Sequence, residues 1–110
     1  MERINLKEKE VFKKEGRGMV NLVNEPYLLI NQVCLESGQN VPEHEANSHV
    51  TLHVLYGEGT FSISGEKGKF GPGNLLRVSL GSPMSIRNES AERLVFLVIK
   101  TPHPDAVEKD

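Results

Sequence analysis

The chain has 110 residues and a single cysteine, Cys34, so it cannot form an intramolecular disulfide, and a reducing, cytoplasmic location is the expectation. No apolar run approaches the length of a membrane span. The charged N-terminus, MERINLKEKE, lacks the apolar core of a signal peptide. Lysine and arginine do not cluster as they do in nucleic-acid-binding surfaces. These absences predict a protein with neither membrane nor nucleic-acid partners.

After residue 16, apolar residues also do not recur at the spacing of about 3.6 residues that is typical of an amphipathic helix. Instead, short apolar stretches rich in β-forming residues follow one another about every ten residues, with glycine, proline and polar turns between them. The net charge of −2, the 37% hydrophobic content and the 25% charged content are ordinary for a globular domain. The pattern predicts one all-β domain of about eight or nine short strands, arranged as a sandwich or barrel.

Composition divides the chain into three parts. Residues 1–16 are a charged lead-in, expected on the surface as a helical turn or along a sheet edge. Residues 17–101 hold all the predicted strands and form the barrel domain. Residues 102–110 are a polar, proline-rich C-terminal tail that we expect to be loosely held.

Two stretches carry regularly spaced glycines: GQNVPEHEANSHVTLHVLYG from Gly38 to Gly57, and GNLLRVSLGSPMSIRN from Gly73 to Asn88. Their spacing resembles the two conserved motifs of the cupin superfamily, G-x5-H-x-H-x3,4-E-x6-G and G-x5-P-x-G-x2-H-x3-N. The motif glycines and the final asparagine are kept, and the resemblance covers about residues 28–100. It implies a double-stranded β-helix, or jelly-roll barrel, of the RmlC-like type, and a homodimer.

The metal-binding positions of the family are mostly lost. The first histidine is kept as His44, but the second histidine is Ala46, the glutamate is Val50, and the histidine of the second motif is Met84. Zinc and non-haem iron sites need three or more nitrogen, oxygen or sulfur donors, and neither alanine nor valine can coordinate. We therefore expect no metal or other cofactor at the family position.

The interior of the barrel follows from the resemblance and from the alternation of side chains along a strand. If His44 faces inward as in the family, the strand after it turns Val54 and Tyr56 inward and His49 and His53 outward. The predicted ligand pocket is apolar with one imidazole. Its expected lining is His44, Ala46, Val50, Leu52, Met84 and Ile86. The sequence thus predicts a small cupin of unassigned activity that binds a small, partly apolar ligand in the barrel.

Two enzymatic alternatives stay open. A metal-dependent dioxygenase or isomerase would need a divalent metal on His44 and His49, with a β-bulge near Asn47 to turn His49 inward. A metal-free enzyme of the sugar-epimerase type would pair a histidine base with a tyrosine acid, for which Tyr56 is the inward tyrosine. Cys34 is expected to be a small buried hydrophobe, not a nucleophile. No residue is assigned a catalytic role.

Overall fold

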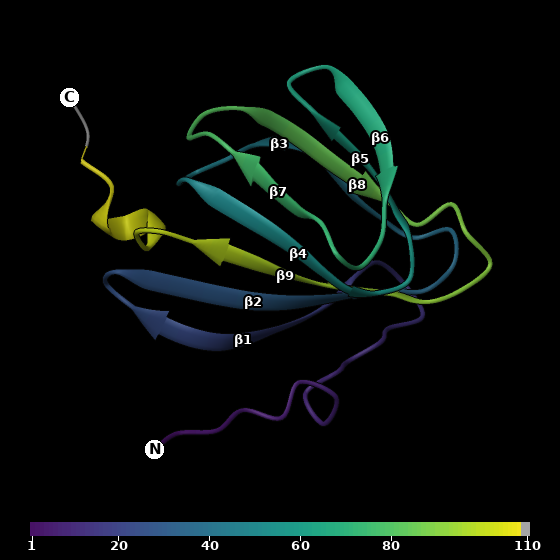
Figure 1. The fold of residues 1–110 in the computed structure, drawn as a ribbon, viewed down its shortest axis with the longest axis horizontal. Helices are drawn as coiled ribbons and strands as arrows, with labels where there is room; N and C mark the ends of the chain where they lie inside the picture. The colour runs from purple at the N-terminus through teal and green to yellow at the C-terminus, as the bar shows by residue number, and fades with distance from the viewer. Residues whose placement is uncertain (109–110) are drawn as a thin grey trace.

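The computed structural model describes residues 1–108, in which nine β-strands form two sheets (Figure 1). The larger sheet has the order β1-β2-β9-β4-β7, and the smaller has the order β3-β8-β5-β6. Every pairing is antiparallel, and the only helical element in these residues is a 3-10 turn, η1. The all-β prediction is confirmed. The elements are β1 (Gly18–Glu25), β2 (Leu28–Leu35), β3 (Asn40–Glu45), β4 (Val50–Tyr56), β5 (Gly59–Ile63), β6 (Glu66–Phe70), β7 (Leu75–Val78), β8 (Pro83–Arg87), β9 (Leu94–Lys100) and η1 (Pro104–Ala106).

The core lies between the two sheets and is built by alternation. On β4 the side chains of Val50, Leu52 and Val54 are buried, whereas the residues between them are partly exposed. Phe61 on β5 and Phe96 on β9 join the two sheets, with ring centroids 6.0 Å apart in an edge-to-face arrangement. Such aromatic pairs contribute about 0.5–1.5 kcal/mol beyond their burial.

Two irregularities in strand pairing change which way side chains face. In β3, Val41 pairs with Ile86 and His44 pairs with Met84, so β3 carries one extra residue between these pairs. Both Val41 and His44 therefore lie opposite interior-facing residues of β8, as expected of a β-bulge.

A second irregularity lies in β4, where Val54 pairs with Phe96 but Tyr56 pairs with Val95. Tyr56 consequently turns to the outer face of the larger sheet, where its hydroxyl donates to Glu10 Oε1 at 2.8 Å. The prediction of an inward Tyr56 was wrong because the bulge resets the alternation on which it depended.

The N-terminal lead-in crosses the outer face of the larger sheet instead of following an edge. Gln32 Nε2 donates to the Leu6 carbonyl at 2.9 Å, and the Arg93 guanidinium lies 4.1 Å from the centre of the Phe12 ring. Beneath the lead-in, the outward side chains of Gln32 and Cys34 are 0% and 1% exposed. At Gly18 a side chain would collide with the carbonyl of Val11, so this close approach requires glycine.

The first residues of the C-terminal tail are hydrogen-bonded to the barrel. Ser48 Oγ donates to the Pro102 carbonyl at 2.6 Å, and the His103 N–H donates to the Pro26 carbonyl at 3.1 Å. The last two tail residues, 109–110, lie outside the described residues. Within residues 1–108 there is no helix long and apolar enough to cross a membrane.

Candidate ligand site in the barrel

A cavity of about 250 Å³ lies between β1, β2 and β9 of the larger sheet and β3 and β8 of the smaller one. Its walls therefore come from strands that are far apart in sequence. The lining residues are Arg17, Met19, Asn31, Val33, Val41, His44, Met84, Ile86, Phe96, Val98 and Lys100. This volume lies just below the range of about 300–1,000 Å³ that is usual for ligand pockets, and it suits a small molecule better than a nucleotide.

The floor of the cavity is apolar and well buried. Val33, Phe96 and Ile86 are at most 3% exposed, and they come from both sheets. Met84 is likewise 3% exposed and contributes a flexible thioether that adapts to ligand shape. A ligand that enters the cavity therefore meets a surface that favours apolar groups.

The rim of the cavity is polar, and two of its side chains are oriented by hydrogen bonds. His44 Nδ1 lies 3.1 Å from the Pro42 carbonyl. Since a carbonyl only accepts, Nδ1 carries the proton and Nε2 remains for a ligand. Asn31 Oδ1 accepts from Asn21 Nδ2 at 3.0 Å, which leaves the Asn31 Nδ2 group as a donor.

Two cations complete the rim. Lys100 is partly buried at the end of β9, and its Nζ donates to Asn47 Oδ1 at 2.9 Å. Burial lowers the pKa of Lys100 below its ordinary value. Arg17 is exposed at the mouth of the cavity. Among the described residues neither cation has an ion pair, and no aspartate or glutamate lines the cavity.

Three of the six predicted pocket residues line this cavity: His44, Met84 and Ile86. The other three, Ala46, Val50 and Leu52, are buried in the core without lining it. Val50 and Leu52 pair with Lys100 and Val98 of β9 on one side and with Val78 and Leu76 of β7 on the other, and their buried side chains pack in the core beside the cavity. The prediction placed the pocket over β4, whereas the structure opens it over β1, β2 and β9.

The cavity is lined by three polar residues besides the predicted imidazole: Arg17, Asn31 and Lys100. All three lie outside the two glycine-spaced stretches from which the pocket was drawn. Alternation from the buried Phe96 predicts an inward Lys100, and alternation from the buried Val33 predicts an inward Asn31. That signal was present in the sequence.

The donor set at the family positions does not fit a divalent metal. His44 and Met84 reach the cavity, but Ala46 and Val50 offer no donor atom. His49, the alternative ligand, lies outside the cavity, and its Nδ1 accepts from the Leu80 N–H at 3.3 Å. Among residues 1–108 no group of three or more histidine, cysteine, aspartate or glutamate side chains is placed to hold a metal ion.

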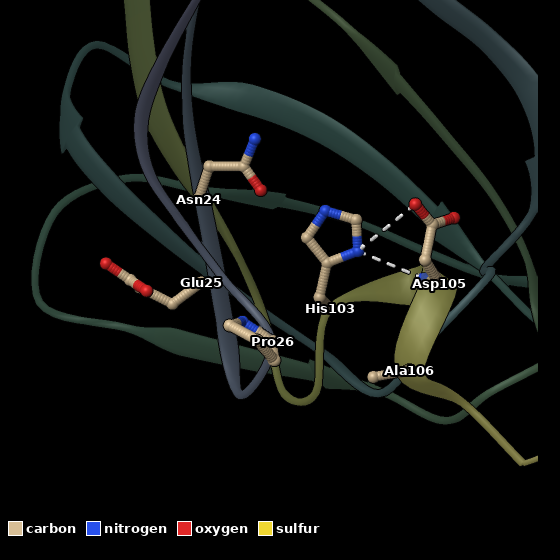
Figure 2. A pocket seen from close by; sticks show the side chains of 6 residues that line it. All are labelled: Asn24, Glu25, Pro26, His103, Asp105 and Ala106. Atoms are coloured by element: carbon tan, nitrogen blue, oxygen red, sulfur yellow. Dashed lines mark hydrogen bonds and ion pairs between the residues drawn. The ribbon is translucent and has the colours of Figure 1, made fainter.

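A second hollow of about 320 Å³ lies at the surface, where the β1–β2 turn meets the C-terminal turn η1 (Figure 2). Its lining consists of Asn24, Glu25, Pro26, His103, Asp105 and Ala106. His103 Nδ1 accepts from the Asp105 N–H at 3.0 Å and lies 3.9 Å from Asp105 Oδ2, as the dashed lines in Figure 2 indicate. Since these polar groups already bind each other and the hollow has no buried apolar floor, the barrel cavity is the stronger candidate site.

Comparison with known proteins agrees with this architecture, although no family model matches the chain. The chain is 34% identical over 96 residues to the uncharacterized protein MJ0764 of Methanocaldococcus jannaschii, covering 84% of this chain and 83% of that protein. The crystal structure of MJ0764, an RmlC-like cupin with a double-stranded β-helix fold, superposes with a TM-score of 0.73 at 33% identity, over 86% of this chain and 90% of the other.

Two further solved structures have the same fold. The protein TT1209 from Thermus thermophilus superposes with a TM-score of 0.85 at 25% identity, covering 93% of this chain and 98% of that chain. A conserved protein of Klebsiella pneumoniae with a double-stranded β-helix domain gives a TM-score of 0.86 at 14% identity, over 93% of this chain and 90% of the other. The two antiparallel sheets and these superpositions define a double-stranded β-helix protein. The chain belongs to the RmlC-like cupin family.

Proposed function

We propose that this cupin is a binding protein that holds a small, partly apolar molecule in the barrel cavity without a metal at the family position. The observation that carries the proposal is the combination of a buried apolar floor with an oriented polar rim in one cavity that is open to solvent at the rim. Small-molecule sites commonly have this composition, with few polar groups that fix the orientation of the ligand.

Apolar burial would supply most of the binding free energy. A ligand that buries about 200 Å² of apolar surface gains about 5 kcal/mol, at about 25 cal/mol per Å², before ordering costs. A neutral hydrogen bond to His44 or Asn31 adds only about 1 kcal/mol net. Affinity for neutral ligands should therefore depend mainly on shape and apolar area.

Binding without catalysis is supported by where the reactive side chains lie. Cys34 is on the outer face beneath the lead-in, and burial raises the pKa of its thiol, which disfavours the nucleophilic thiolate. Tyr56 also lies on that face, hydrogen-bonded to Glu10 and away from His44, so the histidine–tyrosine pair of a sugar epimerase is not formed. For the metal-dependent alternative, the donor set is too small.

The test is a thermal-shift screen of small neutral and singly charged molecules against the wild type and two variants of β9. Val98→Phe places extra volume in the cavity, whereas Ile99→Phe changes the adjacent side chain, which does not line it. We expect ligands that raise the melting temperature of the wild type and of Ile99→Phe but not of Val98→Phe. Equal shifts in all three proteins, or ligands that bind only with added divalent metal, would contradict the proposal.

A further inference from the structure

The charges on the rim of the barrel cavity identify the class of ligand. We propose that the cavity binds a small monocarboxylate, with its apolar body on the buried floor and its carboxylate against Lys100, at the end of the cavity opposite Arg17. This inference rests on the proposed function, because it concerns the ligand of the same cavity. It goes further by specifying the charge of the ligand and the end of the cavity that its charged group occupies.

The charge of the cavity lining is unbalanced. The chain has a net charge of −2, yet the lining of the cavity contains two cations and no carboxylate. In the part of the chain that the structure describes, neither Lys100 nor Arg17 forms an ion pair. Cations in a concave site with low-dielectric walls attract anions from solution. A ligand carboxylate would supply the missing negative charge.

Most polar groups on the rim are hydrogen-bond donors. Lysine and arginine only donate, and the Asn31 amide has its oxygen occupied by Asn21, so its Nδ2 group remains to donate. An ionised carboxylate only accepts, at two oxygens with about four lone-pair sites. Apart from His44 Nε2, which accepts, these rim groups donate, so they complement a carboxylate better than an alcohol or an amide, which would bring donors of their own.

Lys100 lies on the same strand and the same face as two apolar residues of the cavity lining. Lys100, Val98 and Phe96 alternate along β9 and all line the cavity. At about 3.3–3.4 Å per residue, Lys100 and Phe96 lie about 13 Å apart along the strand. A carboxylate at Lys100 thus directs a body of several carbon atoms along Val98 towards Phe96, which suits a medium-chain aliphatic acid or a single-ring aromatic acid.

The partial burial of Lys100 supports the same conclusion. Its Nζ has one hydrogen bond, to Asn47, although an ammonium group has three protons to donate. A desolvated lysine without a counter-ion costs stability in the free protein. A bound carboxylate would offset that cost, because it pairs with the charge inside the site where solvent screening is weak.

The experiment compares acids with their neutral amides by isothermal titration calorimetry. Hexanoate and benzoate are titrated against hexanamide and benzamide, with inorganic phosphate as an anion that has no apolar body. The proteins are the wild type, Lys100→Met, Arg17→Met and the control Lys69→Met, which removes an exposed lysine from β6 outside the cavity. Circular dichroism and melting temperature show that each variant is folded.

We expect the wild type and Lys69→Met to bind the acids more tightly than the amides. Lys100→Met should weaken acid binding by roughly 10- to 100-fold and leave amide binding nearly unchanged, because a hydrogen bond to a charged group is lost. Arg17→Met should leave acid binding nearly unchanged, since the pairing of β1, β2 and β9 places Arg17 at the opposite end of the cavity from Lys100.

Different failures are distinguishable. Amides that bind as tightly as acids, with no effect of Lys100→Met, would overturn the carboxylate inference and leave the proposed apolar binding site standing. Phosphate that binds as tightly as hexanoate would also overturn it, since the floor would then contribute nothing. If neither acids nor amides bind, this inference fails and the screen with Val98→Phe decides separately whether the cavity binds other molecules.

Discussion

His44 lies directly across from Met84 in the β3–β8 pair, and both side chains line the barrel cavity. The pairing depends on one extra residue in β3, because Val41 and His44 are three positions apart while their partners on β8 are two apart. The bulge therefore keeps both β3 residues facing the interior. His44 thus faces the cavity at the position where the motif has its first ligand, but Ala46 and Val50 supply no donor atom.

The cross-strand position of Met84 gives a first prediction. Side chains directly opposite in an antiparallel pair have Cβ atoms about 4.5–5.5 Å apart. Met84→His should therefore create a two-imidazole site with His44 that binds Zn²⁺ or Ni²⁺ more weakly than a natural site, with water molecules as the remaining ligands. At a metal concentration about 100 times the dissociation constant, the gain in unfolding free energy should be about 2.7 kcal/mol. Thermal melts with and without metal measure it.

The control for this variant is Met84→Gln, which brings a side chain of similar length that is not expected to bind the metal. Metal should stabilise neither Met84→Gln nor the wild type. If Met84→His folds and gains no metal-dependent stability, the pairing of His44 with Met84 is misassigned.

Lys100 provides a prediction about stability. Lys100→Met should raise the unfolding free energy of the ligand-free protein at pH 7 slightly, by less than about 0.5 kcal/mol, because it replaces a partly desolvated cation whose charge solvent still screens with an apolar side chain. Urea denaturation of the two proteins measures the difference. Destabilisation by Lys100→Met at pH 7 would show that the Asn47 hydrogen bond outweighs desolvation.

The same pair of proteins has a defined pH dependence. Because burial lowers the pKa of Lys100 in the folded state, the unfolded chain binds more protons between the folded and unfolded pKa values. The stability of the wild type therefore increases relative to the variant as the pH rises through the folded pKa. The advantage of Lys100→Met should shrink on approaching about pH 10, the ordinary range of lysine. If the stability advantage of Lys100→Met over the wild type instead grows with pH, folding does not lower the pKa of Lys100.

Asn88, the last residue of the second motif, has a structural role. Its Nδ2 donates to the Leu35 carbonyl at 3.1 Å and to the Glu92 carbonyl at 2.7 Å, and its Oδ1 accepts from the Ser90 hydroxyl at 2.8 Å. Asn88→Leu should reduce the unfolding free energy by about 2–4 kcal/mol, because the buried Leu35 carbonyl and two part-buried partners lose their hydrogen bonds. Chemical denaturation measures the loss. A loss below about 0.5 kcal/mol, typical of surface changes, would show that this network is unimportant.

The lead-in, residues 1–16, covers Cys34 and should slow the reaction of its thiol with reagents in solution. Burial beneath residues 1–16 raises the pKa of the thiol, so labelling by a thiol reagent should remain slow even near pH 9, where a free cysteine is largely thiolate. Phe12→Ala removes the ring that packs against Arg93 and should accelerate labelling by loosening the lead-in. The rate of labelling under native conditions is the measurement.

Phe70→Ala is the matched control, because Phe70 is a partly buried phenylalanine of the smaller sheet, away from the lead-in. If both variants accelerate labelling equally, Cys34 is exposed by global unfolding, and the local cover that we assign to the lead-in is not what protects it.

Much of the fold follows from the sequence because it depends on local rules. The glycine spacing predicted the barrel, and alternation correctly predicted that Val50, Leu52 and Ile86 are buried. Alternation failed at Tyr56, where a bulge that has no clear sequence signal resets the register.

The site was harder to predict than the fold because it depends on which strands enclose the empty space. The family motifs pointed to β3, β4 and β8, but packing fills the region under β4 with Val50 and Leu52. The open space lies instead under β2 and β9, which bring Asn31 and Lys100 to the rim. Neither of these residues belongs to a motif, so the motif-based prediction missed them, although alternation along β2 and β9 turns both side chains inward.

The most direct test of a carboxylate-binding barrel is a two-dimensional ¹H–¹⁵N NMR titration of the protein with hexanoate. Saturable shifts should concentrate on the amides of β2, β3, β8 and β9 that flank the cavity, including those of Asn31, Val98 and Lys100. Hexanamide should produce the same pattern at higher concentration. Shifts confined to the outer face of the larger sheet or to the hollow at His103, or no saturable shifts with either compound, would contradict the account.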